Sequence, residues 1–193
     1  MKMPILAYGH AALRQPCADV SKEFPRLKEL IGSLWETMYH ANGCGLAAPQ
    51  TGRSLRLFIV DSHSTYEQLD VEGRAHYFHP GDDGIRETFI NAHIESRTGI
   101  MWEDEEGCLS IPGITGNIRR PWSVTITYSD KDFIPRRHTF HGMTARMIQH
   151  EYDHIEGILL TDHLSGITKK LLGGKLKKIE KGQIKTAYPM KFI

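Results

Sequence analysis

The stretch His150-Glu151-Tyr152-Asp153-His154 has the form His-Glu-x-x-His and lies in a segment that we predict to be helical. Histidines four residues apart lie on one face of a helix, so both imidazoles can reach a single metal ion. Glu151 follows the first histidine directly, where its carboxylate can take a proton from water on the metal. The stretch therefore predicts metal-assisted hydrolysis.

The helix that carries this stretch is predicted to run from Met143 to Glu156 and to end at Gly157. Its side chains follow the helical repeat in two stripes. The stripe that we assign to the hydrophobic core consists of Ala145, Ile148, Tyr152 and Ile155. The stripe that we assign to the site consists of Met147, His150 and His154. One face of the helix is thus expected to pack and another to carry the chemistry.

The rest of the chain mixes helix and strand signals, which predicts one α+β domain. Apolar residues recur at three- and four-residue steps over Pro25–Tyr39, as in an amphipathic helix, and a second helix is expected near Thr168–Glu180. Strands are expected at Leu57–Val60, Thr88–Asn91 with an extension over His93–Ser96, Val124–Tyr128, Ile134–Phe140 and Ile184–Phe192. The pattern indicates no internal repeat and no linker.

Two connections complete this outline. Ser129–Asp132 has turn chemistry, so we expect it to join Val124–Tyr128 and Ile134–Phe140 in a β-hairpin. The polar stretch Asp61–Glu87 is interpreted as a long loop or an insertion, with room for one helical turn.

Length and composition set outer limits on fold and function. The 193 residues suffice for a single catalytic domain over residues 1–193, and 40% hydrophobic with 24% charged residues is ordinary for a globular protein. A net charge of +1 argues against a general affinity for nucleic acid or membranes, and no apolar run reaches transmembrane length. Three cysteines and an N-terminus without a signal-peptide pattern favour the reducing cytoplasm.

The third metal ligand has three candidates, because a catalytic metal usually takes three protein ligands and leaves a position for water. Glu156 lies only two residues beyond His154, so a continuing helix would turn it away from the metal. His163 can serve if the chain folds back after the helix. Cys108 is the better candidate, because a thiolate binds Zn²⁺ or Fe²⁺ strongly and a nearby divalent ion deprotonates the thiol.

Three sequence blocks stand in a fixed order and together resemble the signature of the peptide deformylases. The blocks are Gly43-x-Gly45-x-Ala47-Ala48-x-Gln50, Glu106-Gly107-Cys108-Leu109-Ser110 and Gln149-His150-Glu151-x-x-His154. Members of this family remove the N-formyl group from the initiator methionine of new polypeptides. The resemblance extends from the N-terminal segment to about Leu164. It implies an α+β single domain with antiparallel strands packed around a central metal-binding helix.

The resemblance also implies a role for each residue of the site. Cys108, His150 and His154 would bind one divalent metal ion, Fe²⁺ in the cell, with Zn²⁺, Ni²⁺ or Co²⁺ in purified protein. Water activated by the metal would attack the formyl carbonyl, with Glu151 as general base and then acid. The Gln50 side-chain amide and the Leu109 backbone N–H would stabilise the oxyanion. Losing one such donor typically costs about 3 kcal/mol of transition-state stabilisation.

The substrate, an N-formylmethionyl peptide or nascent chain, is expected to lie in a groove between the first two blocks. The residues assigned to this groove are Gly43, Cys44, Gly45, Glu106, Gly107, Arg146 and Met147. Small residues there let the substrate backbone approach closely. Cys44 stands where the resemblance implies an aliphatic residue; we interpret it as a packing residue, with an oxidisable thiol as the alternative. Arg146 either borders the side-chain pocket or is a solvated surface residue.

Two further expectations concern partners and competing functions. The C-terminal tail, residues 166–193, is rich in lysine, which suggests ribosomal RNA and hence the ribosome as a partner. A zinc endopeptidase is the competing enzyme, although Cys108 as the third ligand is unexpected for that class. A structural metal module that binds peptides is the competing non-enzyme, and it would need a closed coordination shell.

Overall fold

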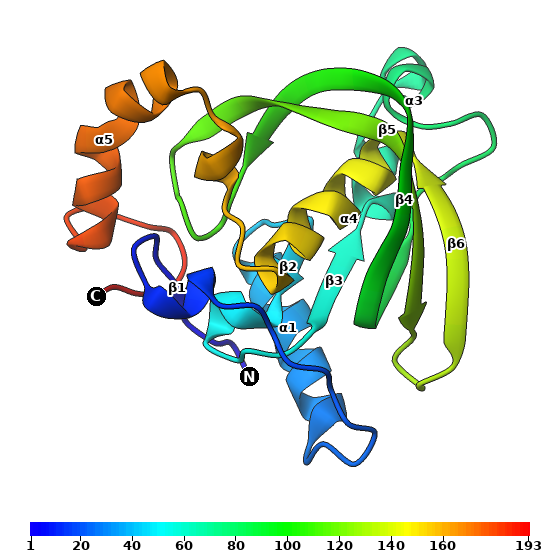
Figure 1. Ribbon diagram of the computed structural model, residues 1–193, viewed down its shortest axis with the longest axis horizontal. Coiled ribbons are helices and arrows are strands. Elements are labelled where there is room, and N and C mark those ends of the chain that lie inside the picture. Colours follow the sequence, from blue (N-terminus) through cyan, green and yellow to red (C-terminus); the bar gives the residue numbers. More distant parts are fainter.

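The computed structural model describes all 193 residues, and a five-stranded antiparallel sheet in the order β2-β3-β4-β5-β6 forms its frame (Figure 1). The strands are β2 (Gly45–Ala47), β3 (Leu57–Asp61), β4 (Arg86–Gly107), β5 (Thr115–Ser129) and β6 (Pro135–His141). The pairing of β4 with β5 shifts register at three points along its length. Such irregularities increase twist and bend strands. Figure 1 shows these two strands arching over helix α4.

Helix α4 (Gly142–Ile155) begins directly after β6 and lies inside the curve of the sheet. Three of the four residues predicted for its core stripe, Ala145, Ile148 and Ile155, are fully buried, while Tyr152 packs against the same core from its edge. Gly157 ends the helix with φ +73°, and a Cβ there would lie 2.6 Å from the Arg14 carbonyl oxygen. The predicted helix is therefore confirmed, with its boundaries within one residue of the prediction.

A second core lies on the other side of β2 and β3. Helix α1 (Leu27–His40) buries Leu34 and Met38 against Leu46 and Ile59 of these strands. The apolar periodicity that predicted a helix over Pro25–Tyr39 is confirmed. This packing holds β2, at the edge of the sheet, beside α4.

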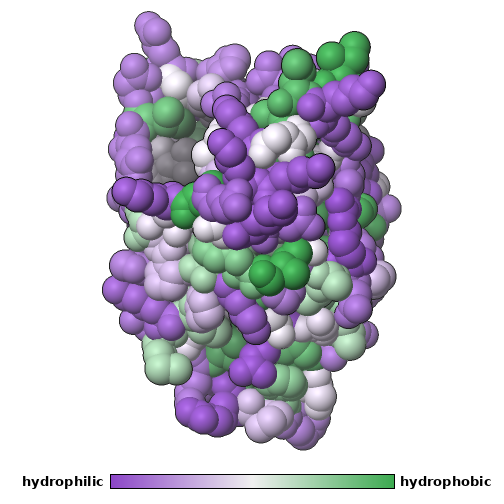
Figure 2. Space-filling view, turned by 90° about the vertical axis from the view of Figure 1, so that its left-hand side faces the viewer, coloured by the Kyte–Doolittle hydropathy of each residue, from purple (hydrophilic) through white to green (hydrophobic).

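The remaining elements are short or peripheral. They are β1 (Ile5–Leu6), η1 (Ala11–Arg14), η2 (Ala48–Thr51), α2 (His63–Gln68), α3 (Val71–Tyr77), η3 (Leu160–His163), α5 (Gly166–Glu180) and β7 (Met190–Lys191), where η marks a 3-10 helix. Helix α5 buries Leu176 and Ile179 and confirms the predicted C-terminal helix. No helix is both long and apolar enough to cross a membrane. On the face that carries α5, hydrophilic residues predominate and hydrophobic ones form small separate patches (Figure 2).

Two sequence predictions need correction. The polar stretch Asp61–Glu87 holds two helices, α2 and α3, where we predicted a loop with one helical turn. Helix α3 is capped by Asp70, whose carboxylate accepts a hydrogen bond from the Gly73 N–H at 2.8 Å. These helices are too short to show an apolar period, which explains the error.

The second correction concerns the C-terminus. The alternation over Ile184–Phe192 predicted a strand, but only Met190 and Lys191 pair, in parallel with β1. Tyr188 instead donates a hydrogen bond from its hydroxyl to the Leu109 carbonyl oxygen at 2.8 Å. The tail is thus fixed by individual side-chain contacts and a two-residue ladder.

Candidate metal centre and active site

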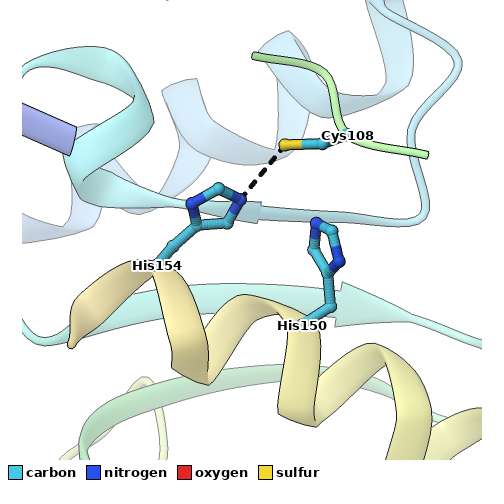
Figure 3. A group of neighbouring side chains, drawn as sticks. All are labelled: Cys108, His150 and His154. Atoms are coloured by element: carbon cyan, nitrogen blue, oxygen red, sulfur yellow. Dashed lines mark hydrogen bonds between the residues drawn. The ribbon is translucent and has the colours of Figure 1, made fainter. Parts of the chain in front are cut away.

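Three side chains with metal-binding atoms converge at the centre of the molecule (Figure 3). His150 and His154 project from one face of α4 toward Cys108, which follows the end of β4. The Cys108 Sγ lies 3.3 Å from the His154 Nε2, and the donor atoms of all three residues lie within 4.8 Å of one another. One thiolate and two imidazoles suit a borderline divalent ion such as Zn²⁺ or Fe²⁺.

The two other candidates for the third ligand point elsewhere. His163 lies 2.8 Å from the Asp153 carboxylate through its Nε2. Glu156 accepts a hydrogen bond from Arg56 at 2.8 Å. Of the three candidates, the structure therefore brings only Cys108 together with His150 and His154.

A buried charge network orients His150. Its Nδ1 lies 3.0 Å from a Glu106 carboxylate oxygen, which leaves the Nε2 for the site. Glu106 in turn accepts hydrogen bonds from Arg120 at 2.7 and 3.0 Å and from Arg146 at 2.5 Å. Burial alone would raise the pKa of Glu106, but the hydrogen bonds from His150 and Arg120 hold this pKa well below its usual range. The carboxylate stays ionised and fixes the imidazole, a common arrangement around bound metals.

The thiol and the carboxyl of the site have shifted pKa values. Burial raises the pKa of Cys108, but the imidazoles of His154 and His150 outweigh it and lower this pKa to about 5. Burial raises the pKa of Glu151 to about 7, against the opposing effect of His150 and His154. The site thus holds a ready thiolate ligand and a carboxylate able to exchange protons near neutral pH.

The Glu151 carboxylate occupies space that is free because the residue opposite it, Gly45, has no side chain. A Cβ on Gly45 would lie 2.4 Å from the Glu151 Oε1, closer than real Cβ contacts, so any other residue there would force the carboxylate to move. The other carboxylate oxygen, Oε2, is buried and has no hydrogen-bond partner in the protein. A buried acceptor without a partner is costly unless water or substrate serves it.

The two predicted oxyanion donors lie close to the thiolate. The Gln50 Nε2 is 3.8 Å from the Cys108 Sγ and 3.2 Å from the Ser110 Oγ. The Gln50 Oε1 accepts a hydrogen bond from the Ala47 N–H at 2.8 Å, so the amide nitrogen must face the site. The Leu109 N–H takes part in no hydrogen bond within the protein, while its carbonyl oxygen is held by Tyr188.

A cavity of about 830 Å³ opens onto these groups. Its lining includes every residue that we predicted to bind substrate: Gly43, Cys44, Gly45, Glu106, Gly107, Arg146 and Met147. His150 and Glu151 also line it, so the cavity reaches the candidate metal centre. This volume suits a short peptide segment or a large side chain with its backbone.

The cavity corrects the interpretation of Cys44 and decides between the two alternatives for Arg146, which borders the cavity. Cys44 does not pack: its side chain is exposed, although the surrounding walls of the cavity raise the pKa of its thiol to about 11. Arg146 is not a solvated residue, because its guanidinium is buried, bound to Glu106 and stacked 4.0 Å from the Trp102 ring centroid. The error for Cys44 arises because the sequence does not show which direction a side chain takes.

Sequence reasoning also missed members of the charge network. Arg120 links Glu106 to Asp153, which accepts its hydrogen bond at 2.9 Å. A signal for Arg120 was present, since it occupies the same face of β5 as the buried Ile118. An arginine at an inward position implies a buried partner.

Comparisons with known proteins agree with this geometry. The family model of polypeptide deformylase matches residues 2–170. The peptide deformylase of Cytophaga hutchinsonii is 44% identical to this chain over 192 residues, which cover 100% of this chain and 98% of that protein. The peptide deformylase of Christiangramia forsetii is 43% identical over 194 residues, which cover 100% and 96%.

Solved structures give the same result for the fold. The crystal structure of a peptide deformylase from Legionella pneumophila superposes with a TM-score of 0.77 at 34% identity, and the match covers 95% of this chain and 98% of that one. The peptide deformylase of Ehrlichia chaffeensis superposes with a TM-score of 0.81 at 27% identity, covering 95% and 99%. The similarity therefore spans nearly the entire chain in both sequence and structure.

Proposed function

This chain belongs to the peptide deformylase family, and we propose that it removes the formyl group from the N-terminal formyl-methionine of newly made polypeptides. The observation that carries the proposal is the meeting of Cys108, His150 and His154 within 4.8 Å, with Glu151 beside them at the end of a peptide-sized cavity. The reaction breaks the amide C–N bond of the formyl group and yields formate and a free methionine amine.

We propose that Cys108, His150 and His154 hold one divalent ion, Fe²⁺ in the cell, with Zn²⁺, Ni²⁺ or Co²⁺ in purified protein. When bound, such an ion makes water nucleophilic near neutral pH and polarises a carbonyl group. Cys108 contributes a thiolate without a large cost because its pKa is about 5. Glu106 holds the His150 ring in position through its Nδ1.

Glu151 is proposed as the proton carrier of the reaction. Its free Oε2 accepts a proton from the attacking water, and the same carboxyl then delivers that proton to the departing nitrogen. A pKa of about 7 suits both steps, because the group gives up and takes a proton with little free-energy difference near neutral pH. The surrounding burial that produces this pKa also keeps bulk water away from the carboxyl.

Gln50 and Leu109 are proposed to stabilise the negative charge that develops on the formyl oxygen. The Gln50 Nε2 is oriented toward the site by the Ala47 N–H, and the Leu109 N–H has no competing partner. Both donors are thus fixed before the reaction begins, which is the condition for strong transition-state stabilisation.

The methionine side chain is proposed to enter the part of the cavity formed by α4. Met143 and Met147 supply flexible apolar surface there, which suits a thioether. Arg146 and Glu106 line the same region but neutralise each other, so they present no unpaired charge to an apolar side chain. Gly43, Cys44 and Gly45 on one side and Gly107 on the other leave room for the substrate backbone.

The proposed activity is tested by assaying formate release from formyl-Met-Ala-Ser alongside cleavage of casein. We expect formate release and no cleavage of internal peptide bonds. Cleaved casein with an intact formyl peptide would favour a zinc endopeptidase. Metal bound without either activity would favour a structural module.

We further propose that the enzyme works in the cytoplasm on nascent chains and meets the ribosome through helix α5. The exposed side chains of this helix include Lys170, Lys175, Lys177 and Lys178, which can contact RNA phosphates. Removing the helix would also remove Leu176 and Ile179 from the core, so truncation is a poor test. The sharper test is a Lys170→Glu, Lys175→Glu, Lys178→Glu variant, whose ribosome co-sedimentation we expect to fall; undiminished binding contradicts the proposal.

A further inference from the structure

The cavity continues beyond the residues to which the proposed function gives a role. Past Cys44, its wall is formed by the end of α1, the end of β3 and helix α2. The residues of this wall are Tyr39, Asn42, Asp61, Ser64, Thr65 and Gln68. All six are polar, in contrast to the methionine-lined floor on α4. This polar wall therefore suits a different part of the substrate.

Part of this wall is a fixed scaffold. Asp61 is buried and accepts hydrogen bonds from the Tyr39 hydroxyl at 2.7 Å, from Ser64 at 2.8 Å and from Arg86 at 3.2 Å. These bonds anchor the start of α2. The Asp61 carboxylate is the only charged group in the wall, and Arg86 forms an ion pair with it. The wall thus presents neither a free anion nor a free cation to the cavity.

Thr65 and Gln68 are the groups that this scaffold leaves free. They lie three residues apart on α2, so they share one face of the helix, and both line the cavity. No hydrogen bond within the protein uses the Thr65 hydroxyl or the Gln68 amide. Helix α2 is held from behind by Tyr66, whose ring meets Phe78 edge-on at 5.2 Å. Two free hydrogen-bonding groups on a fixed helix are suited to contacting a ligand.

A substrate extended along the free edge of β2 would carry its third residue toward this face. Strand β2 is the edge of the sheet, and the chain that precedes Gly45, beside Glu151, runs through Asn42 and Cys44, which both line the cavity. A peptide extended along this edge advances about 3.3 Å per residue, and its side chains alternate in direction. Residue 3 therefore points to the same side as the methionine, about 7 Å farther along the groove.

We propose that Thr65 and Gln68 form a subsite for the side chain of the third residue of the substrate and favour an uncharged hydrogen-bonding side chain there. Serine, threonine, asparagine and glutamine can pair with a hydroxyl and an amide, whereas valine and leucine leave both groups without a partner in the bound state. The inference rests on the proposed deformylase function, since it uses the direction of a formyl-methionyl peptide from Glu151 outward. Helix α2 is then a specificity element.

The test compares kcat/KM for formyl-Met-Ala-Ser and formyl-Met-Ala-Gln with kcat/KM for formyl-Met-Ala-Val, each normalised to formyl-Met-Ala. We expect the polar peptides to be favoured by about three- to tenfold, the range of one or two net hydrogen bonds. The ratio should fall to about 1 in a Thr65→Ala, Gln68→Ala variant. Glu72→Ala on α3, exposed and outside the cavity, is the matched control and should keep the wild-type ratio. The same exchanges at residue 2 should give equal rates, because that side chain points away.

A second variant tests the subsite through an increase in kcat/KM for a new substrate. Gln68→Glu places a charge on the same face, and it should raise the relative kcat/KM of formyl-Met-Ala-Lys by about two- to fivefold. If the double variant fails to turn over formyl-Met-Ala, the Gln68→Glu variant alone decides whether the subsite exists.

The outcomes separate the subsite from the activity. No formate from any formyl peptide overturns the proposed function. If every peptide releases formate but the rates show no preference at residue 3, the subsite is wrong and the deformylase function stands. The same conclusion follows if a preference exists and is unchanged in the Thr65→Ala, Gln68→Ala variant.

Discussion

Glu106 shows how a neighbouring residue can orient a candidate metal ligand. It stands two positions before Cys108 in sequence and touches the ring of His150 in space, so it links two of the three candidate ligands. Its charge survives burial because His150, Arg120 and Arg146 all bond to its carboxylate. The orientation of the candidate metal centre therefore depends on residues that bind no metal themselves.

Replacing Glu106 with glutamine tests this dependence. The amide keeps the size of the side chain but loses the charge that holds the His150 Nδ1–H, and it leaves two buried arginines short of a partner. We expect metal affinity to fall by about 10- to 100-fold. Titration of apo-protein with Zn²⁺ against a competing chelator measures the change. Glu103→Gln, at an exposed position of the same strand, is the control and should bind like the parent; equal affinities in the two variants would contradict the role of Glu106.

The proposed role of Glu151 as proton carrier predicts how the rate depends on pH. Burial raises its pKa to about 7, and only the ionised form accepts a proton from water. We expect kcat/KM to rise with pH from 5.5 through about 7 and then to level off. Glu151→Ala should retain bound metal while losing activity by about 100- to 10,000-fold at every pH.

Metal content and formate release, measured on the same Glu151→Ala samples, check this prediction. A variant that keeps full activity would exclude Glu151 as the proton carrier. If kcat/KM of the wild-type protein does not change between pH 5.5 and 8, the rate does not depend on the ionisation of this carboxyl.

At the scale of single elements, the sequence was most informative where a pattern was long. Helix α4 and its two faces could be predicted from fourteen residues of regular spacing. Helices α2 and α3 could not, because six or seven residues give too few repeats and because their place depends on tertiary contacts, such as the 2.9 Å bond between Ser62 and Thr144. Strand β4 was predicted in two short pieces, since its middle is exposed and lacks an apolar alternation.

Strand β2 shows that an element can matter through the side chain it lacks. A Cβ at Gly45 would displace the Glu151 carboxylate. We expect Gly45→Ala to lower kcat by more than about 100-fold, because a small misplacement of a catalytic group has such effects. Gly174→Ala in helix α5, where a Cβ meets nothing within 4 Å, is the matched control and should keep full activity. Formate-release assays of both variants decide the point, and an active Gly45→Ala enzyme would show that the carboxylate position is not critical.

At the scale of the whole molecule, the site is assembled from distant parts of the chain. Cys108 and His154 lie 46 residues apart, and strands β5 and β6 between them return the chain to the same place. The three sequence blocks predicted the family and the residues that meet at the candidate site, but not the network around them or the polar wall on α2. The network and the wall depend on which residues the fold brings face to face, and spacing patterns in a single sequence do not predict such contacts.

The C-terminal segment extends this assembly to the end of the chain. Strand β7 pairs with β1, and Tyr188 holds the carbonyl of Leu109, whose N–H is a proposed oxyanion donor. The tail thus supports the site as well as presenting lysines at the surface.

The proposed reaction depends on one metal ion bound jointly by Cys108, His150 and His154. X-ray absorption spectroscopy of the zinc-loaded protein tests it directly, with the Cys108→Ser variant beside it. We predict one sulfur ligand at about 2.3 Å and two imidazole nitrogens at about 2.0–2.1 Å in the parent, with the sulfur contribution lost in the variant. A zinc spectrum without sulfur, or one unchanged by Cys108→Ser, would contradict the assignment.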